Sequence, residues 1–400
     1  MGYKGILLLG FATPSKLAEE VFPLDTTPQI ATHKFAWGFA RAVKTACSNF
    51  VLASSVPIQT YPRGRRIVFR SGEFIENGIS GFLLGFVNII LLKHISRLFQ
   101  CLHRLPRYLR LHNVDRMILH GTHTPFMVFA IAMKLWKDTK IFIILTDQHG
   151  VFMPGDFWYQ RLLKRLDTRF MMLMLRQFDG YICLSSVFIE KFGFNKPVLI
   201  FPGIVGEQID LTLSASALRA DDDIFKVVFV GGVNRMNGID KLLKAFTLIN
   251  NNRFSLVIYG DGELREEVVA AARDDLRITY GGRVSDSELI PALFSASLLI
   301  NPKPVDKEYA QTSFPSKLLE YLAVGRPVLT TRVVSIPPEM VDCFLYIDID
   351  TAVGVSEALM RVSRLPAKSR EDMAVRAQQT VRSLYSEAVI GRKVVSFVSG

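Results

Sequence analysis

The sequence predicts an α/β protein made of two doubly wound domains, each with a parallel sheet. Short apolar runs alternate with helical patterns along the 400 residues, and such runs are typical of parallel strands buried on both faces. This series stops at Pro202-Gly203 and starts again at Phe225, after a small, polar and acidic stretch. We therefore expect two domains joined by a linker near residues 203–223, with their strand ends facing a cleft.

Ten strands are predicted from the apolar runs, with helices between them. In the first half they are Ile6–Gly10, Phe50–Ser54, Met117–His120, Ile141–Thr146, Tyr181–Ser185 and Val198–Phe201. In the second half they are Val227–Val230, Phe254–Tyr259, Leu298–Asn301 and Pro327–Thr330. Residues 1–205 and 206–385 are expected to form two Rossmann-like domains, in which ligands bind at the carboxyl ends of the strands.

Composition and charge narrow the classes of protein to which the chain could belong. Apolar residues make up 49% and charged residues 21%, which excludes collagen-like and disordered chains. Lys and Arg outnumber Asp and Glu by 25 to 12 in residues 1–205 but not in the rest, so an anionic partner is expected for the first half. No basic groove with interleaved aromatic residues is evident, which argues against nucleic acid.

The cysteines indicate a reducing compartment, and the apolar segments indicate neither a signal peptide nor a membrane span. The four cysteines lie far apart, which argues against a disulfide framework or a zinc cluster. We expect no signal peptide, because the chain leads directly from Met1 into a strand. The longest apolar run, Phe82–Leu92, is too short to span a bilayer, which takes about 20 residues.

The segment Leu91–Arg107 predicts a basic amphipathic helix. At a turn of about 100° per residue, one face carries Lys93, Arg97, Gln100, Arg104 and Arg107. The opposite face carries Leu91, Ile95, Leu98, Leu102 and Leu105. Such a helix can lie on an anionic membrane surface, and the basic segments Arg63–Arg66 and Arg161–Arg176 favour this. The alternative is that the leucines pack on the sheet of the domain and the charges are solvated.

Two glycine turns follow strands in the second half. The first, Gly231-Gly232-Val-Asn234-Arg235-Met-Asn237-Gly238, precedes a helix over Asp240–Leu248, so its backbone amides could approach an anion. The second is Tyr259-Gly260-Asp261-Gly262. An ordinary structural turn explains either motif equally well.

The stretch from Ser313 to Leu329 is the most informative part of the sequence. Ser313 is expected to cap a helix that Gly325 ends in the left-handed conformation. Amides near Ser316 and Lys317 would then form an anion site, and Glu320, one turn later, could accept hydrogen bonds from a ribose diol. The alternative is a capped helix with a surface lysine and glutamate.

These motifs together resemble the GT-B-fold glycosyltransferases, especially the retaining enzymes of family 4 that assemble surface polysaccharides. The segments FVGGVNRMNGIDKLLKAF, LVIYGDGEL, ITYGGRVSDSELIPALFSASLLINP and FPSKLLEYLAVGRPVLTT occur in the order and at the spacing of that family. The resemblance covers residues 224–332 well and the rest by pattern. It also implies that the last stretch, residues 386–400, forms a helix that returns to the first domain.

The resemblance implies roles for individual residues of the second domain. Glu320 resembles the glutamate that holds the ribose, and Ser316 and Lys317 resemble residues around the diphosphate. The phosphate-side loop corresponds to Gly231, Gly232, Asn234 and Arg235, the second loop to Gly260 and Gly262, and the contact with the base to Arg283 and Val284. The residues expected to act in catalysis are His120, Lys317 and Arg235.

The chain departs from the family pattern at three positions of the donor site. Gly232 and Asn237 stand where many members carry an arginine and a lysine. Thr312 stands where many carry a glutamate that binds the donor sugar, with Glu308 as the nearest acid. Arg235, Lys303 and Lys317 are the candidates for balancing the diphosphate charge.

Two segments of the first half are expected to face the same cleft. Asp115–His123 resembles the strand of the family that ends in a histidine facing the donor sugar, with His120 the best match and His123 the second. The next strand ends at Thr146, and Asp147 or His149 could bind an acceptor hydroxyl. A loop histidine and a capped turn are the alternatives.

The resemblance implies a hexosyltransferase-type enzyme that moves a sugar from a UDP- or GDP-linked donor to a lipid-linked or membrane-associated saccharide, with retention of configuration. It would lie on the cytoplasmic, inner face of the membrane, where lipopolysaccharide and other surface polysaccharides are made. No cofactor and no metal are expected, because no Asp-x-Asp motif ends a predicted strand. Two alternatives are a nucleotide-sugar epimerase and a non-catalytic membrane-surface partner of an assembly complex.

Overall fold

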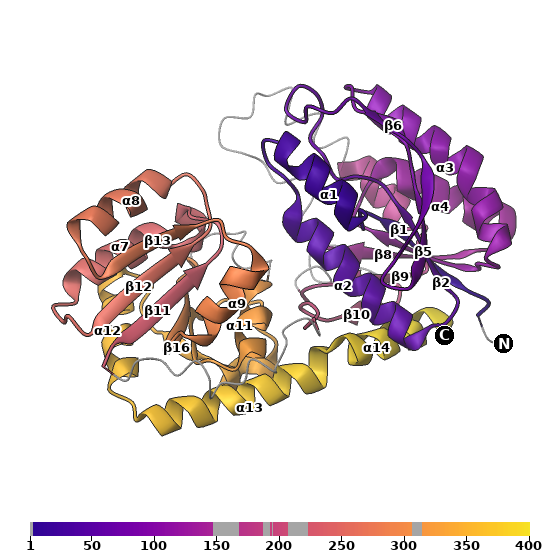
Figure 1. Ribbon diagram of the computed structural model, residues 1–400. Coiled ribbons are helices and arrows are strands. Elements are labelled where there is room, and N and C mark those ends of the chain that lie inside the picture. The colour runs from indigo at the N-terminus through magenta and orange to yellow at the C-terminus, as the bar shows by residue number, and fades with distance from the viewer. Residues whose placement is uncertain (1–2, 147–167, 187–192, 194, 207–222, 306–313) are drawn as a thin grey trace. The chain divides into compact units, whose positions relative to one another are not determined.

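The structure, a computed structural model, describes residues 3–146, 168–186, 193, 195–206, 223–305 and 314–400. The chain divides into two compact units, one formed by residues 1–204 with 387–400 and the other by residues 205–386 (Figure 1). Each unit has a largely parallel sheet with helices packed on it, so the predicted α/β class is confirmed. Among the described helices, none has the length and apolar character that crossing a bilayer requires.

The first unit is built on an eight-stranded sheet with the order β10-β9-β8-β7-β1-β2-β5-β4. Its strands are β1 (Ile6–Gly10), β2 (Phe50–Ser54), β4 (Gly72–Glu76), β5 (Ile79–Leu83), β7 (Arg116–His120), β8 (Lys140–Leu145), β9 (Gly180–Cys183) and β10 (Val198–Ile200). A separate two-stranded sheet pairs β3 (Val68–Phe69) with β6 (Phe86–Val87). Six of the predicted strands are present with ends shifted by at most two residues.

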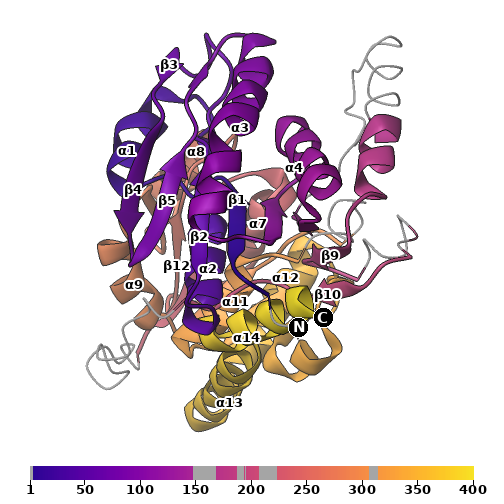
Figure 2. The ribbon, with the colours of Figure 1, turned by 90° about the vertical axis from the view of Figure 1, so that its right-hand side faces the viewer.

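The strand at one edge of this sheet is antiparallel, so the prediction that all strands are parallel is wrong there. β4 runs antiparallel to β5, and the two lie side by side in Figure 2. Asn77 and Gly78 join them, both with positive φ (51° and 68°), which is the geometry of a two-residue hairpin turn. The hairpin forms because Asn-Gly adopts this turn easily, and β4 is a largely exposed edge strand rather than a buried apolar run.

Helices cover both faces of the first sheet. On one face, α3 (Leu92–Leu111) and α4 (Thr124–Lys137) pack on alternate strand residues such as Leu7 and Leu119. On the other, α2 (Ile30–Ala46) packs with α14 (Glu387–Ser399), and Phe397 of α14 contacts Phe142 of β8. Near the start of the chain lie α1 (Ser15–Val21) and the short helix η1 (Phe22–Leu24).

The predicted faces of α3 are wrong over its first half. Lys93 and Arg97, expected to face an anionic membrane surface or solvent, are only 7% and 3% exposed, whereas Ile95 is 62% exposed. The core side of α3, which includes Cys101 and Leu105, continues back in steps of four residues to Arg97 and Lys93. The buried cations bond to main-chain carbonyls: Arg97 donates to Val56 at 2.7 Å and Lys93 donates to Ile58.

The second unit has a six-stranded, all-parallel sheet with the order β13-β12-β11-β14-β15-β16. Its strands are β11 (Phe225–Val230), β12 (Phe254–Tyr259), β13 (Ile278–Gly282), β14 (Leu298–Asn301), β15 (Val328–Thr331) and β16 (Leu345–Ile347). Its helices are η2 (Arg235–Asn237), α7 (Ile239–Leu248), α8 (Arg265–Asp274), α9 (Asp286–Phe294), α11 (Lys317–Val324), η3 (Pro338–Cys343), α12 (Ala352–Ser363) and α13 (Ala367–Tyr385). The four strands predicted here are present, and β13 and β16 were not predicted.

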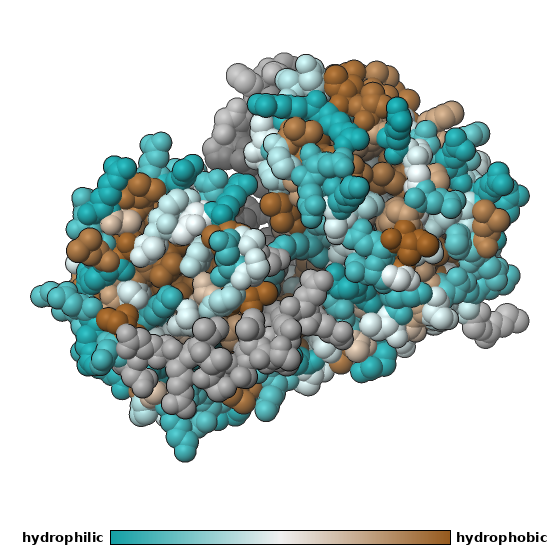
Figure 3. Space-filling view, viewed as in Figure 1, coloured by the Kyte–Doolittle hydropathy of each residue, from teal (hydrophilic) through white to brown (hydrophobic). Residues whose placement is uncertain are grey.

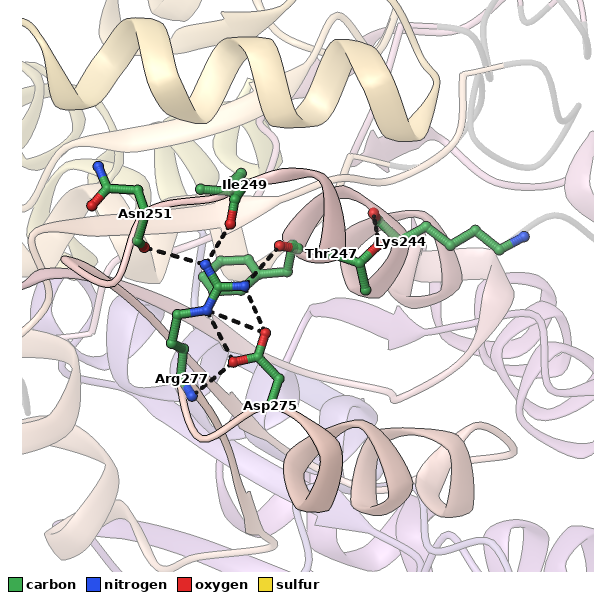
Figure 4. Close-up of polar contacts among 7 residues, drawn as sticks. Lys244, Thr247, Ile249, Asn251, Asp275 and Arg277 are labelled. Atoms are coloured by element: carbon green, nitrogen blue, oxygen red, sulfur yellow. Dashed lines mark hydrogen bonds and ion pairs between the residues drawn. The ribbon is translucent and has the colours of Figure 1, made fainter.

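A single arginine ties several segments of the second unit together (Figure 4). The Arg277 guanidinium forms an ion pair with Asp275 at 2.7 Å. It also donates to the carbonyls of Phe246 and Asn251, both at 3.2 Å, and to that of Ile249. These carbonyls belong to the end of α7 and the turn after it, so Arg277 fixes the connection between α7 and β12.

Candidate functional site

Glycines at the ends of three neighbouring strands meet at the carboxyl edge of the second sheet. The amide of Gly231 donates to Tyr259 at 3.0 Å, and the amide of Gly260 donates to Gly282 at 2.7 Å. A Cβ at Gly260, whose φ is 127°, would overlap the Gly231 carbonyl. The two predicted loops therefore lie directly against each other, and side chains larger than hydrogen would separate them.

Asparagines hold the first loop in shape. The Asn234 side chain accepts a hydrogen bond from the Asn237 amide at 2.9 Å, and the Asn237 side chain donates to the Gly232 carbonyl at 2.8 Å. A Cβ at Gly262 would overlap the Val233 carbonyl of this loop. Gly232 and Asn237, which replace cations of the resembled family, thus take part in a hydrogen-bonded turn.

Lys317, at the start of α11, projects to this loop. Its ammonium lies against Gly231, where a Cβ would overlap it, and 4.7 Å above the centre of the Phe229 ring. Burial lowers the pKa of Lys317 to about 8; nearby Glu320 opposes that shift, and Lys303 adds to it. Burial also lowers the pKa of Lys303, which is 9% exposed. Two largely buried lysines therefore influence each other beside a glycine loop, which is a strongly anion-attracting arrangement.

The helix that carries Lys317 starts later than predicted. α11 begins at Lys317 with Ser316 in the N-cap position, so Ser313, which lies outside the described residues, does not immediately precede it. The Ser316 side chain makes no capping hydrogen bond. Glu320 is exposed on the first turn, and Gly325 ends the helix with a φ of 76°, as predicted. Tyr321 bonds through its hydroxyl to the amide of Val230, at 2.7 Å, and so ties α11 to the end of β11.

Other predicted donor-site residues lie at the surface of the same loops. Arg235 is exposed and lies 3.8 Å from Asp240, and Arg283 lies 3.4 Å from Asp261. Val284, after β13, is half-buried. The structure thus brings Lys317 to Gly231, while both arginines pair with local carboxylates. Thr312 and Glu308 lie outside the described residues.

An Asp-x-Asp sequence does follow a strand, one that was not predicted. Asp348 and Asp350 come directly after β16. Asp348 pairs with Arg361 at 2.5 Å, and Asp350 pairs with Lys241. Within the described part of the chain, no group of three His, Cys, Asp or Glu side chains is placed to hold a metal ion.

The first unit contains a cavity of about 760 Å³ at the carboxyl ends of β7 and β8. This volume lies in the range of small-molecule sites. Its wall includes His120, the last residue of β7, and His123, the residue before α4. Burial lowers the pKa of His120 to about 4, so its imidazole is neutral at physiological pH. The predicted pair of histidines therefore lies in one cavity, whereas Asp147 and His149 lie outside the described residues.

Arg97 sets the tautomer of His123. Its guanidinium lies 3.1 Å from Nε2 of His123, and because arginine can only donate, Nε2 must accept. Burial, with Arg97 and His94 adding to it, holds the pKa of His123 well below the usual range. The ring is thus neutral with its proton on Nδ1, and that atom is buried without a hydrogen-bond partner among the described residues. Arg97 was expected on an exposed face, toward a membrane surface or solvent, and its four-residue spacing from Cys101 and Leu105 was the signal for its burial.

Comparisons with known proteins agree with this geometry. Residues 224–363 match the family model described as Glycosyl transferases group 1. No curated protein matches the chain.

Solved structures resemble the chain over its whole length. Sucrose-phosphate synthase from Thermosynechococcus elongatus has a TM-score of 0.67 at 13% identity, with 98% of both chains covered. HepE from Anabaena in complex with UDP has a TM-score of 0.61 at 11% identity, again with 98% of both covered. Trehalose 6-phosphate synthase from Burkholderia multivorans has a TM-score of 0.64 at 12% identity, with 100% of this chain and 98% of that one covered. The chain therefore has the GT-B fold of these glycosyltransferases, and residues 224–363 of its second unit match the glycosyltransferase group 1 family.

Proposed function

We propose that the protein transfers a sugar from a nucleoside diphosphate donor, UDP- or GDP-linked, to a lipid-linked or membrane-associated saccharide, with retention of configuration. The observation that carries the donor half is the Lys317 ammonium against Gly231, at the start of α11. HepE from Anabaena, a protein of this fold, is recorded in complex with UDP and in complex with UDP and glucose. The proposed setting is cell-surface polysaccharide synthesis, on the cytoplasmic face of the membrane.

In the proposed mechanism, Lys317 and the amides at the start of α11 stabilise the negative charge that develops on the leaving diphosphate. Lys303 adds to the positive potential, and Glu320 accepts hydrogen bonds from the ribose. These groups are fixed before the reaction, because α11 is tied to β11 through Tyr321. We propose that the reaction needs neither a metal nor another cofactor.

The donor half is tested by Lys317→Ala and Glu320→Ala. We expect Lys317→Ala to lower kcat about 100-fold or more, because a preorganised cation facing developing charge is lost. Glu320→Ala should weaken binding of UDP measured by calorimetry. The matched controls are Lys244→Ala and Glu266→Ala, exposed residues of α7 and α8, which should leave both quantities unchanged. If both site variants transfer sugar at a rate within a few-fold of the wild type, with every donor tried, the donor-site assignment is wrong.

Two measurements on the wild-type protein distinguish the proposed transferase from the alternatives. A nucleotide-sugar epimerase would convert donor in the absence of acceptor, so donor incubated alone should give no epimer. A non-catalytic partner would show no affinity for nucleoside diphosphates, so calorimetry with UDP and GDP should show binding of one of them.

A further inference from the structure

The end of β11, which leads into the first glycine loop, is completed by a side chain of α11. β11 pairs with β12 as far as Val230, its last residue, whereas its pairing with β14 ends at Val228. The Tyr321 hydroxyl bonds to Val230 beyond that point. It accepts the Val230 amide at 2.7 Å and donates to the Val230 carbonyl at 3.2 Å. One hydroxyl therefore serves both polar groups of the last strand residue, as a further strand partner would.

Tyr321 and Lys317 contact successive residues where β11 turns into the first loop. They lie four residues apart on α11, so their side chains lie on the same side of the helix. Tyr321 bonds to Val230, and the Lys317 ammonium lies against Gly231, the next residue. The bond to Val230 therefore fixes how closely the first loop approaches the ammonium.

The Tyr321 hydroxyl acts through its neighbours rather than on a ligand. Tyr321 is 1% exposed, and its hydroxyl both donates and accepts inside the second unit. Burial raises the pKa of Tyr321, so the hydroxyl keeps its proton at physiological pH. The other end of α11 is held separately, because Gln378 and Arg382 of α13 donate to the Ala323 carbonyl at 2.7 and 3.2 Å. Loss of the hydroxyl alone should thus release the loop and leave the helix in place.

We infer that the Tyr321 hydroxyl is a positioning group of the proposed donor site, which holds the first loop against Lys317. The inference rests on the proposed function and adds a residue to it. A hydroxyl that only stabilised the fold would leave the surroundings of Lys317 as they are. A positioning hydroxyl also keeps water from the ammonium, because the amide and carbonyl of Val230 bind water once they lose their partner.

The substitution Tyr321→Phe removes the hydroxyl and keeps the ring. Water at Val230 should hydrate the Lys317 ammonium, so we expect the pKa of Lys317 to rise from about 8 to roughly 9. Glu320 and Lys303, the charged groups that act on Lys317, are the same in the variant. An NMR titration of the ligand-free full chain, with its lysines labelled with carbon-13, measures this pKa. The resonance of Lys317 is the one that Lys317→Arg removes.

The matched control is Tyr346→Phe. The Tyr346 hydroxyl donates to the Val341 carbonyl at 2.8 Å, elsewhere in the second unit. This variant loses a hydroxyl bond to the main chain as Tyr321→Phe does, and it should leave the pKa of Lys317 unchanged. An unchanged pKa in Tyr321→Phe, or an equal rise in the control, would overturn the inference.

Donor binding should show the same effect through its pH dependence. Calorimetry uses UDP, or GDP where that is the nucleotide the wild type binds. At pH 7 the affinity of Tyr321→Phe should be about fivefold lower than that of the wild type, which corresponds to one hydrogen bond. Between pH 7 and pH 9 it should fall less than in the wild type, because a raised pKa keeps the ammonium charged. A parallel fall in both proteins would contradict the inference.

Self-association must not alter these affinities. Apolar side chains are gathered on the surface of the first unit over the start of α3 (Figure 3), among them Ile95 and Phe99. All titrations therefore use a protein concentration at which light scattering shows a single species.

Hydrogen exchange of the wild type tests the inference should Tyr321→Phe fail to fold. The Val230 amide should exchange about 100-fold or more slowly than in an unstructured chain, because the hydroxyl accepts it. Free exchange of this amide would overturn the inference. Neither the NMR titration nor the exchange measurement needs a ligand. Both therefore decide whether the hydroxyl holds the loop, whereas a wild type that binds neither UDP nor GDP would overturn the proposed function.

Discussion

At the scale of single residues, Arg277 is the clearest stabilising contact of the second unit. Its side chain is 19% exposed and pairs with Asp275 while donating to carbonyls at the end of α7. Arg277→Ala leaves this carboxylate and these carbonyls without their partner, so we expect a loss of about 2–4 kcal/mol in the free energy of unfolding. Arg277→Lys should recover only part of it, because one ammonium cannot span the carboxylate and the carbonyls together.

Urea unfolding followed by circular dichroism measures these losses. The control is Arg265→Ala, an exposed arginine at the start of α8. An Arg277→Ala variant as stable as the control would show that solvent replaces the network at no cost.

The second prediction at this scale is the pH dependence of donor binding. Burial lowers the pKa of Lys317 from 10.5 to about 8, so its ammonium is lost as the pH rises through 8, well before that of an exposed lysine. We expect UDP affinity to fall about tenfold between roughly pH 7 and pH 9, and UDP binding above pH 8 to take up a proton. Calorimetry in two buffers of different ionisation enthalpy measures both effects.

Lys317→Arg is the matched control for this pH dependence. Arginine stays charged throughout the range, and the variant shares any titration of the ligand itself. A wild-type profile as flat as that of Lys317→Arg would mean that Lys317 does not face the diphosphate.

At the scale of elements, the strands that were predicted are those with continuous apolar runs. β1, β2, β12 and β14 have the predicted bounds, because a strand buried on both faces has few polar residues to obscure its ends. β4 and β13 were missed because they are edge strands with half-exposed side chains. For β4 a signal was present in the Asn77-Gly78 turn.

Helix α3 shows why the candidate site was only partly predictable. Its periodicity predicted a helix. The face that carries Lys and Arg was expected to be the exposed one, and this expectation fails where the cations are buried. Lys93 and Arg97 satisfy their donors with carbonyls of a loop distant in sequence, and sequence spacing does not show which carbonyls lie nearby. In the second unit, by contrast, the turns and the end of α11 are local features, and the resemblance to the glycosyltransferases implied that Lys317 and the first loop lie near the same diphosphate.

At the scale of the whole molecule, the last helix belongs to the unit that contains the N-terminus. In α14, Ile390, Val394 and Val398 are fully buried, and Glu387 pairs with Arg41 of α2 at 2.8 Å. Gly391 lies so close to α2 that a Cβ there would overlap the carbonyl of Ala42. The stability of the first unit therefore depends on residues that the chain reaches only after completing the second.

Gly391→Val tests this dependence by forcing α14 away from α2. We expect the first unit to lose about 1–3 kcal/mol, the usual cost of overpacking, while Arg392→Ala, an exposed neighbour on α14, changes neither unit. Calorimetric unfolding with and without UDP assigns the transitions, because a ligand of the second unit raises the midpoint of that unit alone. The first transition should fall in Gly391→Val, and the UDP-sensitive one and the affinity for UDP should stay unchanged. A fall in the UDP-sensitive transition instead would place the role of α14 in the second unit.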